Sequence, residues 1–212
     1  MKLLSTFTLL LLINLNAFAG KLPVNGQIIT ATDTVEVVFL IPINTRNDIA
    51  DYEKLQEKIT YMNGADKVTL KPGQAKEVRF VFRSRSIRMV SRKNTLMLGS
   101  LLVMEGDIFL KLEIDGKLKL FTYYNTRSTP VGGVGVPGGA PMAGGVIRSS
   151  VQKSIFQKGE EALMMPDGIS FRSDMKKYLS DCPQLVSKFE NKELKKEDVD
   201  YIVNFYNNTC GK

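Results

Sequence analysis

The chain contains no histidine and no tryptophan, and it has only two cysteines among its 212 residues. Histidine is the commonest general base and a common zinc ligand. Its absence therefore excludes Ser-His-Asp and Cys-His catalytic arrangements and argues against a zinc site. Beyond residue 19 the sequence also lacks an apolar run long enough to span a bilayer. We therefore expect no transmembrane segment in that part of the chain, no bound metal and no other cofactor.

The first nineteen residues carry the three parts of a secretory signal peptide. Residues 1–2 give a short positive start, residues 9–13 form an apolar run, and Ala-Phe-Ala at 17–19 provides a small-residue cleavage site. We expect cleavage after residue 19, which leaves a mature chain that begins at Gly20 and is exported from the cytosol. The sequence leaves open whether the protein stays in the periplasm or becomes extracellular.

The two cysteines are Cys182 and Cys210, both near the end of the chain. In an oxidising compartment an even number of cysteines favours a disulfide. A redox dithiol or a metal pair is the alternative, but there is no C-x-x-C motif, and two thiols without histidine make a poor zinc site. We therefore predict a structural disulfide between them.

Alternation of apolar and polar residues predicts strands over most of residues 24–124. The cleanest strand is 77–83, in which buried positions alternate with an outward row of Arg79, Val81 and Arg83. The clearest hairpin is 108–124, with a type I′ turn predicted at its Asp-Gly dipeptide. Residues 44–56 are ambiguous between a helix and an irregular loop.

Residues 129–145 interrupt this pattern with seven glycines and three prolines. Ordering such a segment costs much conformational entropy and buries little surface, so a flexible loop is predicted at 129–147. A phosphate-binding loop would need a preceding strand, a following helix and a Lys-Ser/Thr pair, and that set is absent. A further hairpin is predicted at 148–168, with its arms at 151–157 and 161–165.

After residue 168 the apolar spacing becomes helical, as Phe171, Met175 and Tyr178 illustrate. Asp181 is placed to cap a second helix, which has a proline in its first turn. Together these patterns predict an α+β fold. An antiparallel β-rich domain at 20–128, barrel-like or sandwich-like, precedes a small helical bundle at 169–212.

The positive charge of the chain is concentrated in residues 71–93, where eight basic residues face one acidic residue, a net charge of +7. Such a local excess suggests an anionic neighbour, although a solvated strand face explains it as well. The candidate ligand-binding residues of this basic stretch are Arg79, Arg83, Arg85, Arg88, Arg92 and Lys93.

Carboxylate pairs are the other candidate chemistry, because glycosidases need two carboxylates about 5–10 Å apart in a cleft. The pairs present are Glu113/Asp115, Glu160/Glu161 and Glu197/Asp198. They fall at or beside turns and at a helix start, where solvated or capping roles suffice. We therefore assign no catalytic residue.

Four stretches of the chain carry a resemblance to known proteins. The first is Leu-Lys-Pro at 70–72 followed by Ala-Lys-Glu-Val-Arg-Phe at 75–80, and the second is Ile-Arg-Met-Val-Ser-Arg at 87–92. The third is Phe-Leu-Lys-Leu at 109–112, which runs into Gly-Lys-Leu-Lys-Leu at 116–120. The fourth is Asp-Cys-Pro-Gln-Leu at 181–185, together with Tyr-Asn at 206–207 and Cys210. This set resembles a family of uncharacterised secreted proteins of Bacteroidota, in which a β-rich domain precedes a C-terminal helical segment. The resemblance implies architecture and export, and no reaction mechanism.

These observations favour a non-enzymatic protein of the periplasm or cell envelope that binds or serves as a structural accessory. Its basic face would contact an anionic envelope component or a protein partner. Nucleic acid is not expected, because export separates the chain from most of it and no stacking aromatic residue follows Phe82 among the arginines. The alternative is a small secreted hydrolase that uses carboxylates, which a cleft of converging acids would favour.

Overall fold

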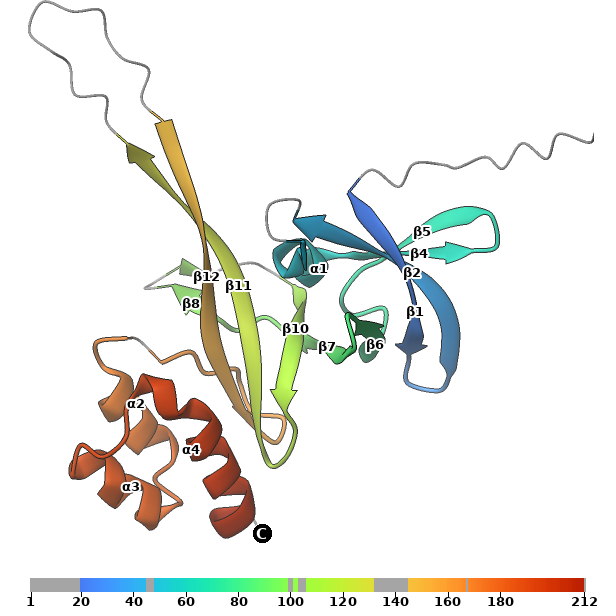
Figure 1. Cartoon of the computed structure of the whole chain (residues 1–212). Helices are drawn as coiled ribbons and strands as arrows, with labels where there is room; N and C mark the ends of the chain where they lie inside the picture. Colours follow the sequence, from blue (N-terminus) through green and yellow to red (C-terminus); the bar gives the residue numbers. More distant parts are fainter. Residues whose placement is uncertain are drawn as a thin grey trace, which may run out of the picture.

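The computed structural model describes residues 20–44, 48–98, 101–102, 106–131, 145–166 and 168–211. The expected signal peptide lies outside these residues, as does the part of the expected loop at 132–144. Ten of the described strands form one antiparallel sheet in the order β12-β11-β10-β7-β6-β1-β2-β4-β5, with β3 added to β2 (Figure 1). The sheet does not close into a barrel. The predicted α+β, β-rich fold class is confirmed.

The strands of this sheet are β1 (Lys21–Ile29), β2 (Thr34–Asn44), β3 (Ile49–Ala50), β4 (Ile59–Asn63), β5 (Asp66–Leu70), β6 (Glu77–Phe82), β7 (Arg85–Lys93), β10 (Asp107–Ile114), β11 (Leu118–Val131) and β12 (Gly145–Lys158). A separate ribbon pairs β8 (Met97–Leu98) with β9 (Leu101–Leu102). The α-helices are α1 (Tyr52–Glu57), α2 (Phe171–Tyr178), α3 (Pro183–Glu190) and α4 (Val199–Phe205). Two short helical turns, Lys196–Asp198 and Tyr206–Cys210, flank α4.

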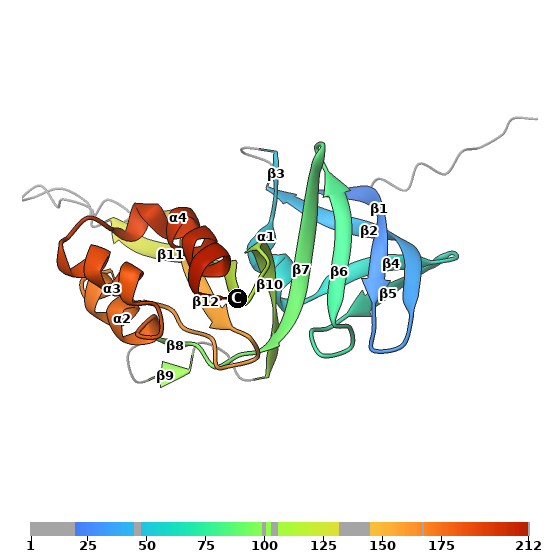
Figure 2. The ribbon, with the colours of Figure 1, turned by 90° about the horizontal axis from the view of Figure 1, so that it is seen from below.

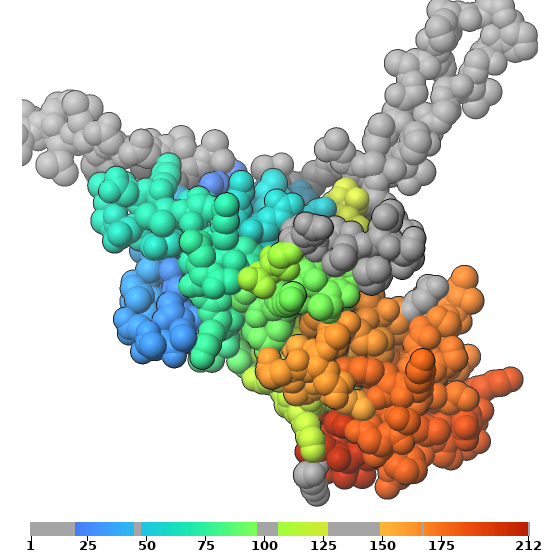
Figure 3. All heavy atoms as spheres, turned by 180° about the vertical axis from the view of Figure 1, so that it is seen from behind, coloured from blue at the N-terminus to red at the C-terminus, as the bar shows by residue number. Residues whose placement is uncertain are grey.

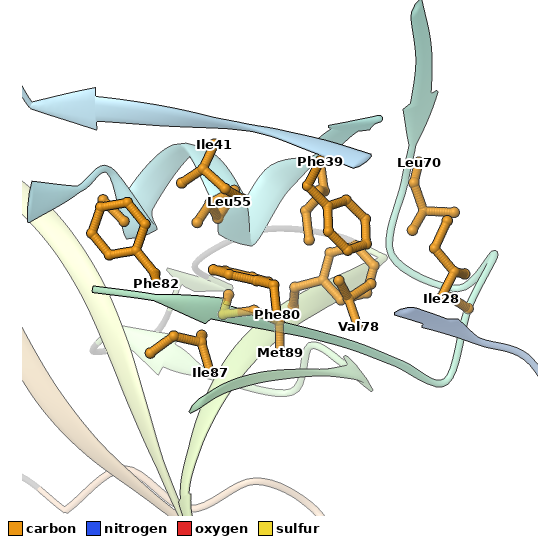
Figure 4. Close-up of a cluster of buried hydrophobic side chains, with 14 residues drawn as sticks. Ile28, Phe39, Ile41, Leu55, Leu70, Val78, Phe80, Phe82, Ile87 and Met89 are labelled. Atoms are coloured by element: carbon orange, nitrogen blue, oxygen red, sulfur yellow. The ribbon is translucent and has the colours of Figure 1, made fainter. Parts of the chain in front are cut away.

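The first half of the sheet surrounds one hydrophobic core to which β1, β2, β6, β7 and α1 all contribute. Figure 4 shows Phe82 and Ile87 at one end of this core and Ile28 and Leu70 at the other. The ambiguous segment at 44–56 contains the helix α1, and the Asp51 side chain caps its start by accepting a hydrogen bond from the backbone N–H of Lys54. α1 lies beside β10 (Figure 2). Phe109 of β10 also belongs to this core, which therefore reaches across β7 to β10.

The second half of the sheet is built on the hairpin of β11 and β12, whose arms pair from Leu118 and Lys158 to Val131 and Gly145. Both ends of the segment predicted as a loop at 129–147 are therefore strand. The hairpin predicted within 148–168 also differs. β12 pairs with β11 along its length, and Met164 alone in the second predicted arm bridges back to β12. Alternation assigns a strand's faces but not its partner, which explains the difference.

The hairpin predicted at 108–124 is confirmed as β10 and β11, but its turn is not type I′. Three residues connect the strands, Gly116 has a φ of 159°, and the register shifts between Leu112 and Ile114. The Asn207 side chain lies against this turn, where it accepts a hydrogen bond from the backbone N–H of Leu118 at 2.8 Å and donates one to its C=O at 2.9 Å. A Cβ at Gly116 would overlap that amide. The C-terminal segment thus shapes the turn.

The C-terminal helices form a lobe against β11 and β12 (Figures 2 and 3). Their core joins Leu118, Leu120 and Phe156 of the hairpin to the buried faces of α2, α3 and α4. Asp181 does not cap α3, because Cys182 occupies the N-cap position. The Asp181 carboxylate instead accepts a hydrogen bond from the Tyr206 hydroxyl at 2.6 Å and pairs with the Lys158 ammonium at 2.7 Å.

The predicted disulfide is present between Cys182, at the start of α3, and Cys210, in the turn after α4. The two Cα atoms lie 5.5 Å apart, within the range that a disulfide spans. The disulfide therefore links the start of α3 to the turn after α4 within the helical lobe.

Replacing both Cys182 and Cys210 with alanine should lower the free energy of unfolding by about 3–4 kcal/mol, because the unfolded chain regains the entropy of the closed loop. Urea unfolding of the exported native chain and the double variant measures this difference. Thiol titration of the denatured native protein should find no free thiol. Two reactive thiols, or equal stabilities, would contradict the pairing.

Candidate functional site

The basic stretch is not one continuous face, because its members fall on both sides of the sheet and at both ends of β7. Arg79 and Arg88 are cross-strand partners on one face. Arg85 lies opposite Phe82 and shares the other face, the one that carries the first core. Side chains alternate along a strand, so Arg85 and Arg88, three residues apart, must point in opposite directions.

Glu77 neutralises Arg79 and Arg88. Its side chain is only 11% exposed and accepts a hydrogen bond from the Nε of each arginine at 2.6 Å, with a third from Arg88 Nη2 at 3.0 Å. Burial opposes ionisation of Glu77, but the hydrogen bonds from Arg88 and Arg79 outweigh it and hold its pKa below the usual value. Arg88 also pairs with Asp115 at 2.9 Å. This face therefore keeps little charge for a partner.

Arg92 is also engaged inside the protein. Its Nε donates to the Gln157 side chain at 2.8 Å, and its guanidinium carbon lies 5.7 Å from the centre of the buried Phe121 ring. It thereby links β7 to β12 over the core of the second half of the sheet. Lys93, the next residue, is exposed at the end of β7 and has no ion pair with a described residue.

Arg83 lies outside β6, in the turn to β7, and so does not continue the outward row of Arg79 and Val81. Arg83 and Ser84 both have positive φ, 50° and 62°, as a type I′ turn requires. Arg83 forms an ion pair with Asp48, whose φ is also positive at 56°. Left-handed backbone costs a non-glycine residue about 1–3 kcal/mol, and such strain gathers at ligand sites and switches.

Arg85 stands at a cavity of about 500 Å³, here named the tyrosine cleft. Its lining residues are Ile49, Tyr52, Phe82, Arg83, Arg85, Ile87, Lys111, Glu113, Tyr124 and Gln152. The cleft opens at the end of the first core marked by Phe82 and Ile87 in Figure 4. No described carboxylate pairs with Arg85. Of the six candidate residues, this one combines an uncompensated charge with a concave, partly apolar site.

Tyr52 and Tyr124 form the aromatic wall of the tyrosine cleft. Their rings stack with centres 4.8 Å apart and planes 21° apart. The Gln56 amide fixes α1 in place, because it hydrogen-bonds the backbone C=O and N–H of Tyr124 at 2.9 and 2.6 Å. Burial raises the pKa of both phenols, and the Glu113 carboxylate raises it further. Both tyrosines therefore remain neutral at physiological pH.

Lys111 and Glu113 form the polar side of the cleft. The Lys111 ammonium lies 2.8 Å from a Glu113 oxygen and 5.4 Å from the centre of the Tyr52 ring. The Thr122 hydroxyl donates to the same carboxylate at 2.6 Å. Among the described residues, Glu113 is the only carboxylate that lines the cleft. Its sequence neighbour Asp115 is held by Arg88, so this pair does not converge on one site.

The other carboxylate pairs also lie in local structural contacts. Glu160 is 79% exposed and approaches Lys119 at 3.6 Å. Asp198 accepts a hydrogen bond from the backbone N–H of Lys195 at 2.9 Å. Among the described residues, no three cysteine, aspartate or glutamate side chains are grouped so that they could hold a metal ion.

A larger open groove, of about 920 Å³, lies at the opposite end of β6 and β7. Its lining includes three basic residues, Lys76, Arg92 and Lys93, and three acidic ones, Glu77, Asp107 and Glu160. No aromatic side chain of the described ranges lines it. With its charges balanced and no aromatic wall, it is a weaker candidate than the tyrosine cleft.

Among the cleft residues, the sequence singled out Arg83 and Arg85 as candidate ligand-binding residues and Glu113 as half of a carboxylate pair, but it did not bring them together with the tyrosines. Tyr52 lay in the segment that was ambiguous between helix and loop, and Tyr124 stood at the end of the hairpin predicted at 108–124. The contact between α1 and β11 joins residues about seventy positions apart, and no local pattern signals such a contact. Comparison with protein-family models, curated proteins and solved structures found no match to this chain. Within the described ranges, no helix is both long and apolar enough to cross a membrane.

Glu77→Gln should lower the free energy of unfolding by about 1–3 kcal/mol at neutral pH, because the charge-assisted hydrogen bonds to both arginines are lost. The pKa of Glu77 is lowered in the folded state, so this contribution is present above the usual pKa and fades as the pH falls through the folded value. Urea unfolding of both proteins at pH 7 and near pH 3 measures the effect.

The control is Glu160→Gln, at a carboxylate that is 79% exposed. That variant should differ from the native chain by less than about 0.5 kcal/mol at either pH. An equal effect of the two substitutions, or a Glu77→Gln deficit that is no smaller near pH 3 than at pH 7, would contradict the role given to Glu77.

Proposed function

We propose that this protein is an exported, non-enzymatic binding or accessory protein of the cell envelope, and that it contacts an anionic component through Arg85 at the tyrosine cleft. The signal peptide expected at 1–19 and the resemblance to secreted Bacteroidota proteins support export to the periplasm or the extracellular side. The excess of positive charge in the basic stretch supports an anionic partner.

The position of Arg85 carries this proposal. Arg79, Arg88 and Arg83 pair with carboxylates, and Arg92 is engaged by Gln157. Arg85 has no such partner among the described residues, and it lies beside two aromatic rings in a cavity. A guanidinium in a concave site binds an anion better than one on a flat, hydrated face, because neighbouring protein atoms reduce screening by water.

The alternative, a carboxylate-dependent hydrolase, has less support. Hydrolysis of a glycosidic bond by this route needs two carboxylates across one cleft. In the part of the chain that the structure describes, Glu113 is the one carboxylate that lines the tyrosine cleft, and its side chain is held by Lys111 and Thr122. The arrangement therefore favours binding over hydrolysis.

Replacing Arg85 with glutamine should weaken anion binding about tenfold, because a charge-assisted contact is lost. The measurement is titration of the native chain and its variants with three anionic probes: phosphatidylglycerol vesicles, heparin and phenylbutyrate. At least one probe should bind, and added salt should weaken that binding through screening. Stability should change by less than about 0.5 kcal/mol, since Arg85 is exposed.

Two variants that each remove one positive charge, as Arg85→Gln does, serve as controls. Arg79→Gln removes a paired charge from the opposite face, and Lys93→Gln removes an unpaired charge from the far end of β7. Each should change affinity by less than about twofold, because each lies outside the cleft. Equal losses in all three variants would show that only net charge matters, and binding of none of the probes would refute the proposal.

A further inference from the structure

We propose that the ligand of the tyrosine cleft is a small amphipathic monocarboxylate, whose carboxylate pairs with Arg85 and whose apolar body lies against the aromatic wall. This inference rests on the proposed function, because it names the class of anion that the same site takes. It excludes an extended polyanion or a lipid surface as the occupant.

The charges of the cleft fit a single negative charge. Arg83 is neutralised by Asp48, and Lys111 is neutralised by Glu113. Arg85 is left as the uncompensated cation among the lining residues. A second negative charge on the ligand would meet no further uncompensated cation among the lining residues, which disfavours a dianionic phosphate. A planar guanidinium also matches a carboxylate through two parallel hydrogen bonds.

The uncharged lining fits an apolar ligand body. Phe82 and Ile87 belong to the first core and reach the cleft from its inner end. Tyr52 and Tyr124 supply the aromatic wall, and Ile49 is 48% exposed at the cleft. A cavity of about 500 Å³ lies within the range of small-molecule sites, which are mostly apolar with a few placed polar groups.

The edge of the cleft is held by a contact between two loops. Arg83, which lines the cavity, forms an ion pair with Asp48, and both residues hold left-handed backbone. At Arg83 this conformation belongs to the two-residue turn between β6 and β7. The ion pair therefore holds this turn at the cleft.

The first test uses a tryptophan reporter, which the native chain allows because it contains none. Ile49→Trp places the reporter at the cleft, and Val81→Trp places a matched one on the opposite face of β6, at a side chain that is 60% exposed. Phenylbutyrate should change the emission of the Ile49→Trp protein saturably and leave that of the Val81→Trp protein unchanged. Calorimetric titration of the native chain with phenylbutyrate should give the same affinity as the fluorescence titration. Because the native chain carries no reporter, this titration detects binding even if the tryptophan at position 49 blocks the cleft.

The second test varies the ligand and the charge separately. Phenylbutanol keeps the apolar body without charge, butyrate keeps the charge with little body, and phenylbutyl phosphate carries a second charge. Each should bind the native chain at least about tenfold more weakly than phenylbutyrate. Arg85→Gln should weaken phenylbutyrate binding by about tenfold or more, and Lys93→Gln by less than about twofold.

The outcomes separate this inference from the proposed function. Arg85-dependent binding of vesicles or heparin without phenylbutyrate binding would overturn the monocarboxylate and leave the proposed function standing. Phenylbutanol or phenylbutyl phosphate binding as tightly as phenylbutyrate would also overturn it. If no anionic probe binds the native chain, both the proposed function and the monocarboxylate inference are refuted.

Discussion

The carboxylate of Glu77 holds the middle of the sheet together electrostatically. The hairpin of β6 and β7 connects the two halves, because β6 pairs with β1 and β7 pairs with β10. Glu77 binds Arg79 of its own strand and Arg88 of the next, and Arg88 continues the network to Asp115 in the turn after β10. A carboxylate that is nearly buried must have such partners, since an isolated buried charge is costly. Much of the positive charge of the basic stretch is therefore paired with carboxylates inside the fold.

This use of charge determines where an external anion can bind. Arginines already hydrogen-bonded to a carboxylate offer a partner little, because the partner must displace a contact that is in place. Arg85 differs through its place in the strand. It is the first residue of β7 and lies on the face that carries the core, at the point where the core borders the cleft beside Tyr52 and Tyr124. The same alternation that directs Arg88 to Glu77 directs Arg85 into the cleft.

Much of the fold follows from local patterns, and most of the site does not. Alternation predicted β6 and the hairpin of β10 and β11, helical spacing predicted the C-terminal helices, and cysteine count with compartment predicted the disulfide. The partners of the charges were not predictable, since Arg92 meets Gln157 sixty-five residues away. The cleft depends on a similar long-range contact, between Gln56 of α1 and Tyr124 of β11. Positive φ at both turn positions was expected at the Asp-Gly dipeptide of the β10–β11 turn. It occurs instead at Arg83 and Ser84, the two residues that connect β6 and β7.

The central claim is that Arg79, Arg88 and Arg92 are engaged inside the protein whereas Arg85 is not. Hydrogen exchange of the arginine side chains tests this claim most directly. The Nε–H groups of Arg79, Arg88 and Arg92 each donate to a protein side chain, and Arg85 has no such acceptor among the described residues. In protein carrying nitrogen-labelled arginine, the Nε–H protons of those three residues should exchange with water at least about tenfold more slowly than that of Arg85. Rapid exchange at Arg79 and Arg88, or equal protection at Arg85, would contradict the account.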